Sequence, residues 1–529
     1  METSDFSGKQ LTEEPHYSAP KDEGKANETF EACEVSDEKS YLISKPKNGD
    51  VLGKSSDFEN VVKVPLRFFI LGPMLFIMIF CFATNSLIIT QYVYDVIEKE
   101  EFPEKHFNKS EDVVVCYENK TSQDYLDQQV VQRQASTYNI YVALCAGIPG
   151  MFSNLVLASL SDRYGRKPFI CVSITGMFVA TSMLAVGVYL EWNIYALLAF
   201  QFVGGSTGGW IAALSIGFAA VADITRAGRS RAFAIVLIEI AVGMGALVGS
   251  ALSGYLIDGV GYYTALVISA SVACTALMLS LIFPETLKKE HSRKHNVLQT
   301  FKNIFLFYSG DISVVGRRWK FLACLTALFF TFLSNFGKLG IETLYQLNSP
   351  FCWSPVKVGW YTTLRAGLPL VIGMGLIKPF QACIDEHVIG ILGTISYIAG
   401  YVLEALATND LMMFIVAFIS FMGALPVPIL RAIMSHMTPP EQQGSLFAGV
   451  AAVETVCTVV GSVTGNAIYA ATVDWFRGFT FLLFAGYTGI TGYCSSIQNE
   501  EKGRNVYVYQ AIHMKTWIYN QMLVQIKKN

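Results

Sequence analysis

Runs of about 20 apolar residues recur along the chain from Val64 onward, and each is long enough to cross a bilayer as an α-helix. The run that begins near 319 is interrupted by Asn335 and Lys338, and the run that begins near 357 is interrupted by Arg365. The pattern predicts twelve spans, near residues 66–93, 138–160, 168–190, 193–220, 232–257, 261–283, 319–345, 357–381, 388–407, 411–434, 446–470 and 476–496.

Three polar segments divide the apolar pattern. Residues 1–63 are rich in Glu, Lys, Ser and Asp, which predicts a disordered tail, and residues 498–529 form a second polar tail. The basic segment 284–318 separates six spans in residues 64–283 from six in residues 319–497. We therefore expect an all-α membrane protein of two six-helix bundles about a pseudo-twofold axis, with a cavity between them.

The composition excludes the other broad classes. Of the 529 residues, 52% are hydrophobic and 15% are charged, against about 25% charged in soluble domains. Such a chain has too few polar groups to cover a water-facing surface, so soluble enzymes, disordered proteins and collagens are excluded, and membrane lipid must solvate most apolar side chains. The formal net charge of −3 gives no indication of a nucleic-acid partner.

The basic residues of the short loops predict the orientation, because such residues collect on the cytosolic side. They follow spans two, four and six, at Arg163, Arg166, Lys167, Arg226, Arg229, Arg231, Lys288, Lys289, Arg293, Lys294, Lys302, Arg317 and Arg318. We expect these loops and both tails to be cytosolic. The loop 94–137 is then exoplasmic, and it contains two glycosylation sequons, at Asn108 and Asn119.

Two of the eleven cysteines, Cys116 and Cys352, fall on the exoplasmic side of this map. An oxidising lumen would permit a disulfide between them that joins the two halves of the chain. The alternative is two free thiols.

A charged motif follows the second span. Residues 158–167 read ASLSDRYGRK, which resembles the cytosolic signature G-x-x-x-D-x-x-G-R-[RK] of the major facilitator superfamily, with Ala158 in place of the first glycine. Asp162 can accept hydrogen bonds from a neighbouring helix N-terminus, and Gly165 permits a tight turn. Arg166 and Lys167 can pair with adjacent helices. We assign these four residues, with Asp223, to a cytosolic gate.

Stretches scattered from about residue 66 to 497 resemble the proton-coupled folate transporter family, solute carrier family 46. They are Thr90-Gln91-Tyr92, Val221-Ala222-Asp223, Leu237-Ile238-Glu239, Thr343-Leu344-Tyr345, Phe351-Cys352-Trp353, Pro428-Ile429-Leu430-Arg431-Ala432 and Glu441-Gln442-Gln443-Gly444-Ser445-Leu446-Phe447. The resemblance implies organic-anion transport with protons, a proton-coupling role for Glu239, a substrate-handling role for Arg431, and the Cys116–Cys352 disulfide.

Two positions depart from the family pattern. Ser206 stands where the folate carrier has an acidic residue in span four, and Asn335 stands where it has a histidine in span seven. The resemblance at these two substrate-site candidates therefore indicates a substrate other than folate.

Four charges in predicted spans are independent candidates, because an ionisable group near the centre of a bilayer costs about 2.5–3.5 kcal/mol unless it meets water or a partner. Glu239 could carry the coupled proton or pair with a cation. Arg431, after Pro426 and Pro428, could bind an anion in a locally broken helix or extend to the cytosolic interface. Arg365 and Glu454 could contact substrate or form structural pairs.

The remaining motifs give weaker indications of function. Tyr92 is a further candidate for lining the cavity, although aromatic residues at membrane interfaces often act as anchors. Gly243-x-Gly245-x-x-x-Gly249 and Gly461-x-x-x-Gly465 are interpreted as faces for close helix packing. The sequence contains no P-loop, nucleophile motif or metal-ligand set that would indicate an enzyme, a cofactor or a metal site.

The sequence thus predicts an alternating-access symporter that moves an organic anion or hydrophilic conjugate, such as a folate-like compound, a steroid conjugate or a cell-wall fragment, into the cytosol. The alternative is a transporter-like receptor or scaffold without flux. Glu38-Lys39-Ser40-Tyr41-Leu42-Ile43 and Tyr509-Gln510-Ala511-Ile512 fit sorting motifs that clathrin adaptors bind. They make an endolysosomal membrane a rival to the plasma membrane.

Overall fold

The structure is a computed structural model that describes residues 69–103, 121–225, 229–287, 317–438 and 443–496. The chain divides into Met1–Lys63 and a compact unit, Val64–Asn529, which contains all the described residues. Both sequons, Cys116, the two sorting motifs and most of the interbundle segment lie outside the described ranges.

The described helices of the N-terminal half are long and apolar. They are α1 (Leu71–Glu101), α3 (Gln123–Tyr164), α4 (Arg166–Tyr189), α5 (Ile194–Ser206), α6 (Gly209–Ile224) and α7 (Arg229–Ile282). Gly261 interrupts α7 with a φ of 76° and a ψ of 170°, a conformation that glycine adopts readily. Both arms of α7 contact α1, since Thr84 donates to the carbonyl of Gly249 and Cys81 donates to that of Ser269.

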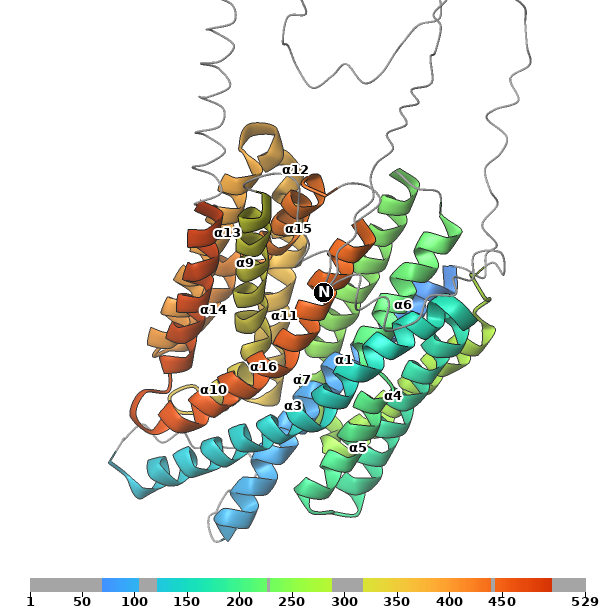
Figure 1. Cartoon of the computed structure of the whole chain (residues 1–529). Coiled ribbons are helices and arrows are strands. Elements are labelled where there is room, and N and C mark those ends of the chain that lie inside the picture. Colours follow the sequence, from blue (N-terminus) through green and yellow to red (C-terminus); the bar gives the residue numbers. More distant parts are fainter. Residues whose placement is uncertain (1–68, 104–120, 226–228, 288–316, 439–442, 497–529) are drawn as a thin grey trace, which may run out of the picture. The chain divides into compact units, whose positions relative to one another are not determined.

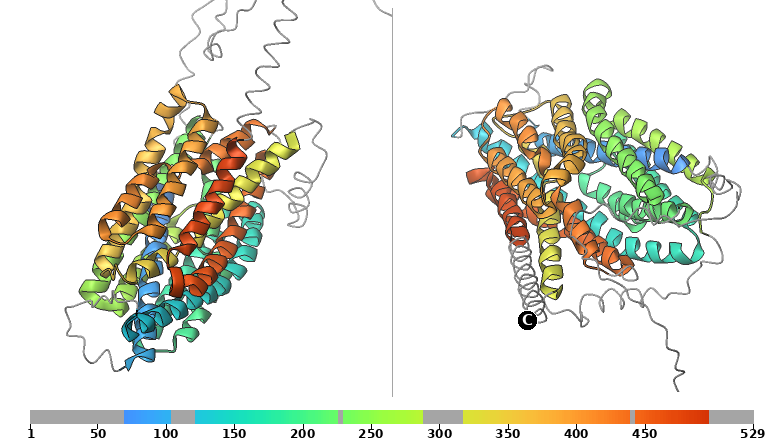
Figure 2. Two further views of the ribbon diagram at one scale, coloured as in Figure 1. Left: turned by 90° about the vertical axis from the view of Figure 1, so that its left-hand side faces the viewer. Right: turned by 90° about the horizontal axis from the view of Figure 1, so that it is seen from above.

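The helices of the C-terminal half are more often broken (Figure 1). They are α9 (Arg317–Gly337), α10 (Ile341–Leu347), α11 (Pro355–Leu368), the π-helical η3 (Pro369–Gly373), α12 (Met374–Cys383), α13 (Glu386–Leu406), α14 (Asp410–Ile419), the 3₁₀ turn η4 (Ser420–Met422), α15 (Pro426–His436), α16 (Gln443–Phe476) and a helix over residues 479–496. From above, most of the yellow-to-red helices lie on one side and most of the green helices on the other (Figure 2).

Within the described ranges, nine helices are long and apolar enough to cross a membrane. One of them contains both arms of α7, and neither α11–α12 nor residues 479–496 is among the nine. With these segments the described chain makes the twelve passes that the hydrophobic pattern predicts, and the all-α class is confirmed.

The helices next to the first predicted loop are longer than expected. We expected a loop over 94–137, but α1 continues to Glu101 and α3 begins at Gln123. Ser122 caps α3, because its hydroxyl accepts from the amide of Tyr125 at 3.2 Å. The added turns are polar, so they do not belong to the apolar runs that predict the spans.

Glycines bring helix backbones together as the small-residue motifs predict. A Cβ at Gly245 would lie 2.4 Å from the carbonyl oxygen of Phe76, and one at Gly249 would lie 2.6 Å from that of Phe80. In the other half, a Cβ at Gly465 would lie 2.5 Å from the carbonyl oxygen of Gly337. The α1–α7 and α9–α16 interfaces therefore depend on residues without side chains.

Candidate functional site

A cavity of about 560 Å³ lies between the halves, with α7 on one side and C-terminal-half helices on the other. Glu239 comes from α7, and Asn335 comes from α9. The remaining lining residues are on α13, on α15 and just before α15, namely Tyr397, Ala424, Val427, Pro428, Arg431, Ala432 and Ser435. The two charges that the sequence pattern and the family resemblance single out thus face one cavity.

Arg431 is held by a carboxylate of its own half. Its Nη2 lies 2.7 Å from Oε2 of Glu454 on α16, and its guanidinium carbon lies 5.7 Å from the centre of the Phe332 ring. Each side chain of the pair is 35% exposed, so ligand and water can reach it. The expected break in this span is confirmed, because α14 ends at Ile419 and α15 restarts at Pro426.

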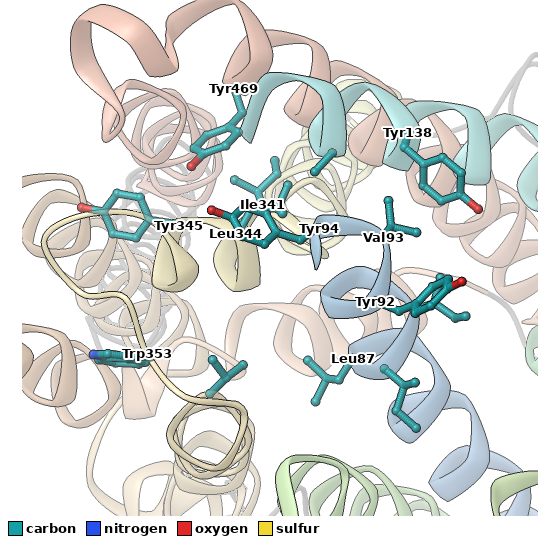
Figure 3. Close-up of a cluster of buried hydrophobic side chains, with 14 of the residues drawn as sticks. Leu87, Tyr92, Val93, Tyr94, Tyr138, Ile341, Leu344, Tyr345, Trp353 and Tyr469 are labelled. Carbon is teal, nitrogen blue, oxygen red and sulfur yellow. The ribbon is translucent and has the colours of Figure 1, made fainter. Parts of the chain in front are cut away.

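The halves close against each other at one end of the molecule. Tyr94 of α1, Leu344 of α10 and Tyr469 of α16 belong to one buried hydrophobic cluster that joins both halves (Figure 3). Buried polar contacts between α3 and the C-terminal half add to it. Gln129 donates to Asn348 at 3.1 Å, and Tyr469 donates to Gln132 at 3.1 Å.

The cavity lies away from this closed end. Ser435 lines the cavity and is one residue from the C-terminal end of α15. The closed end, in contrast, contains the turns around residues 261, 347–354 and 477–478. Arg133 and Asp474 form an ion pair there between α3 and α16. The contacts between the halves that the described residues make thus seal this end, and the cavity lies toward the other.

The turn between α3 and α4 is organised by Arg166, which is mostly buried. Its side chain binds Asp223 at 3.0 Å and Asp162 at 2.5 Å, and it donates to Ser161 at 2.8 Å. Gly165 has a φ of 115°, which glycine tolerates. Four of the five predicted gate residues thus come together here.

Sequence reasoning missed Glu285, which follows α7. Its carboxylate accepts from the backbone amides of Arg166 at 2.8 Å and Lys167 at 3.2 Å, so it caps the N-terminus of α4. We expected Asp162 to accept from a helix N-terminus, but Asp162 accepts from the Arg166 side chain instead. The Lys167 ammonium donates to the carbonyl of Leu281 at 2.7 Å. In the sequence, the signal for this cap is a carboxylate that directly follows a span and lies close to a glycine turn in the fold.

Four predicted substrate-site residues are not part of the cavity lining: Glu454, which binds Arg431, and also Arg365, Tyr92 and Ser206. Arg365 is 4% exposed and pairs with Glu342 and Glu404, each at 3.5 Å. Of the two alternatives for this residue, a substrate contact or a structural pair, the structural pair is observed. Tyr92 is buried in the closed-end cluster, in an edge contact with Tyr262. Ser206 is exposed and donates to the carbonyl of Phe202 in its own helix.

Cys352 is disulfide-bonded, and its partner lies outside the described residues, as does Cys116. The eight other described cysteines form no disulfide. Among the residues that the structure describes, no three His, Cys, Asp or Glu side chains come together as a metal site.

The fold and the cavity define a membrane transporter of the Major Facilitator Superfamily, whose family model matches residues 131–347. The human organic anion transporter MFSD10 superposes with a TM-score of 0.57 at 14% identity, covering 81% of this chain and 99% of that one. A transporter of the POT family in complex with 5-aminolevulinic acid gives 0.56 at 13% identity, covering 80% and 94%. At such identities the likeness supports the fold alone.

Curated relatives are similar over most of their length. The lysosomal proton-coupled steroid conjugate and bile acid symporter SLC46A3 of Homo sapiens is 30% identical, over 80% of this chain and 92% of that protein. The proton-coupled folate transporter of Rattus norvegicus is 26% identical, over 78% and 88%. The chain belongs to solute carrier family 46 of the superfamily, a family of transporters rather than enzymes.

Proposed function

We propose that this protein is a proton-coupled symporter that moves an amphipathic organic anion into the cytosol by alternating access. The observation that carries the proposal is the cavity itself, where Glu239 from one half faces Arg431 from the other. When a proton-binding group and an anion-binding group share one cavity, binding of the proton can change the affinity for the anion, and the reverse.

Arg431 is the proposed anion contact. A guanidinium stays charged and offers a planar fork of donors that matches carboxylate, sulfate or phosphate oxygens. Glu454 occupies part of that fork, since its Oε2 lies 2.7 Å from Nη2 of Arg431. A substrate anion would use the remaining donors, so Glu454 fixes the orientation of the guanidinium.

Glu239 is the proposed proton carrier. While ionised, it repels a substrate anion that binds at Arg431 across the cavity. When protonated, it removes this repulsion and can donate a hydrogen bond. Anion binding and protonation therefore favour each other, which is the thermodynamic requirement for symport.

The lining favours a substrate with a large apolar body and a single anionic group. Ala424, Val427, Pro428 and Ala432 give an apolar wall, and Arg431 is the cation among the described lining residues. A steroid conjugate or bile acid, of the kind that the human relative carries by its name, fits this balance. A folate, with two carboxylates and a polar ring, fits less well.

The first test is uptake by cells or vesicles with the outside at about pH 5.5 and at about pH 7.5. We expect wild-type uptake of a sulfated steroid to be larger at the acidic value. Glu239→Gln should lose this pH dependence and at least about tenfold of the acid-driven accumulation. It should still exchange labelled for unlabelled substrate at equal pH, because a neutral glutamine mimics the protonated carboxyl.

Lys320, a charge outside the cavity lining, provides a control variant, Lys320→Gln, that should behave as wild type. Equal wild-type uptake at both pH values for every accepted compound would contradict proton coupling. Specific binding without any uptake would identify the receptor alternative.

We infer that the closed end faces the exoplasm and that both termini are cytosolic, since the basic turn around Arg166 lies on the cavity side. On the exoplasmic side we place the glycans at Asn108 and Asn119, and Cys116 as the disulfide partner of Cys352. An endolysosomal location is supported by the lysosomal relative and by the tail motif that ends in Leu42-Ile43, through which we propose binding to clathrin adaptors.

Replacing both apolar residues of that motif, Leu42→Ala with Ile43→Ala, should move the protein to the plasma membrane, because adaptors read them as an apolar pair. Surface biotinylation and co-localisation with a lysosomal marker measure the shift. A control variant at the neighbouring Lys45→Ala should leave the location unchanged. An unaltered lysosomal pool in the double variant would contradict the assignment.

A further inference from the structure

A second set of charges is buried in the C-terminal half and is not explained by the cavity. Arg365 on α11 lies between Glu342 on α10 and Glu404 on α13, at 3.5 Å from each. Arg365 is 4% exposed and Glu404 is fully buried. Uncompensated charge is costly in such a place, so the charge balance of the cluster must be nearly neutral.

In direct contact, one guanidinium faces two carboxylates, and Lys338 adds a more distant positive charge that acts on Glu404. Among the described residues, Lys338 forms no ion pair with either carboxylate, and its ammonium lies 5.8 Å from the centre of the Tyr397 ring. The guanidinium of Arg477 is engaged by the carbonyls of Ser349 and Ala407. Apart from Arg365 and these two cations, the titratable groups around the cluster are phenols: Tyr345, Tyr361, Tyr397 and Tyr401.

The two carboxyls meet at one guanidinium, because each lies 3.5 Å from Arg365. If both were ionised, each would only accept, so the two carboxyls could not hydrogen-bond to each other. Within the described part of the chain, the Glu404 oxygens and the Arg365 nitrogens form no close hydrogen bond, because the guanidinium lies 3.5 Å from each carboxylate. A proton on one carboxyl permits a hydrogen bond between the two carboxyls, relieves their repulsion and leaves a single negative charge opposite Arg365. We propose that Glu342 and Glu404 hold one exchangeable proton between them beside Arg365, so that this cluster is a second proton-binding site of the transporter.

The position of the cluster suits exchange during the transport cycle. Glu404 is two residues from the end of α13 at Leu406, next to the closed end, and its carbonyl accepts from the Tyr345 hydroxyl at 2.8 Å. Tyr397 lines the cavity, and its ring centre lies 5.7 Å from the guanidinium carbon of Arg365. The cluster is thus separated from the cavity by one side chain, and opening of the closed end would expose it to the exoplasm.

The direct test does not need transport. Purified full-length protein in lipid nanodiscs is measured by infrared spectroscopy at neutral pH, where a protonated carboxyl gives a carbonyl stretch that an ionised one lacks. We expect wild type to show this band, Glu404→Gln and Glu342→Gln each to remove the part that belongs to the cluster, and Glu239→Gln to retain that part. A wild-type spectrum that neither cluster variant changes would overturn the proposal.

Transport gives the second readout, and this part rests on the proposed symport. A gradient of about two pH units supports roughly 100-fold accumulation per coupled proton. Each single glutamine variant should lose at least about tenfold of this accumulation and retain substrate exchange at equal pH. Full pH-driven accumulation in both variants would overturn a coupling role. Absence of pH-driven uptake in wild type would refute the proposed function instead, while the infrared band would still support the shared proton.

The amount of folded protein in the membrane distinguishes a shared proton from a structural network in which both carboxylates are ionised. A single glutamine mimics the protonated partner, so Glu342→Gln and Glu404→Gln should both reach the membrane in wild-type amounts. The double variant leaves Arg365 buried without a counter-ion and should fail to accumulate. Loss of both single variants would mean that both carboxylates are ionised in the fold, which would overturn the proposal.

Discussion

Arg431 is the residue on which the proposed recognition depends. It meets a carboxylate of its own half at 2.7 Å and shares a cavity with Glu239 of the other half. A partly exposed arginine bound by one carboxylate keeps donors for a further anion, whereas a lysine offers a single point charge. The identity of the cation at this position should therefore affect substrate affinity more than folding.

We expect Arg431→Lys to raise the KM for an anionic substrate by about tenfold, since a charge-assisted hydrogen bond is worth about 1.5–3 kcal/mol. Arg431→Met should abolish uptake. Concentration-dependent uptake, corrected for the amount of protein in the membrane, measures both effects. Wild-type KM in the methionine variant would show that the anion binds elsewhere.

Helix α7 is the element that places Glu239. Its glycines allow it to approach α1 so closely that a Cβ at Gly245 would meet a backbone carbonyl. The π-helical η3 contributes Leu370, which occupies the space beside Gly243. One turn of α7 thus contacts both halves just after the proposed proton carrier, so changes in this packing would shift Glu239 as well.

Gly245→Ala should destabilise the protein by about 1–3 kcal/mol, because the added methyl group meets the Phe76 carbonyl. Gly486→Ala is the matched control, since nothing lies within 4 Å of a Cβ at that position. The Tm in detergent, read from the fluorescence of an unfolding-sensitive dye, should fall for the first variant and stay within a degree or rise for the second. Equal Tm values would contradict the proposed close approach.

At the scale of the whole molecule, one end is sealed by contacts between the halves and the other holds the cavity. Gln129 and Asn348 exchange hydrogen bonds at 3.1 and 3.3 Å across the sealed end, and both are almost fully buried. Alternating access requires these contacts to break in every cycle. A covalent link at the same place should hold the molecule in the observed state.

The paired variants Gln129→Cys and Asn348→Cys, bridged by a short bifunctional thiol reagent with a reducible linker, should reduce uptake to background, and a reductant should restore it. Each single cysteine variant is the control and should transport under both conditions. Normal uptake with the crosslink formed, as shown by a mobility shift on a gel, would contradict movement at this end.

Much of the molecule follows from the sequence, with identifiable exceptions. Apolar run length predicts the passes, and the rarity of charge in lipid singles out Glu239 and Arg431. Run length does not predict the polar first turns of α3, which a side-chain cap and contacts with the other half stabilise. The partners of Arg365 were also missed, because Glu404 lies near the end of its span and hydropathy cannot show that this span lies beside α11. Glu285 was missed because hydropathy likewise cannot show that it lies beside the N-terminus of α4.

The shared carboxyls of Glu342 and Glu404 bear on how voltage acts on this transporter. A monoanion that travels with one proton moves no net charge, so the electrical potential across the membrane neither helps nor opposes it. If the buried pair delivers a second proton, each cycle carries one positive charge inward, and about 100 mV then contributes about 2.3 kcal/mol to uptake. The pair would thereby convert an electrically silent carrier into one that generates current.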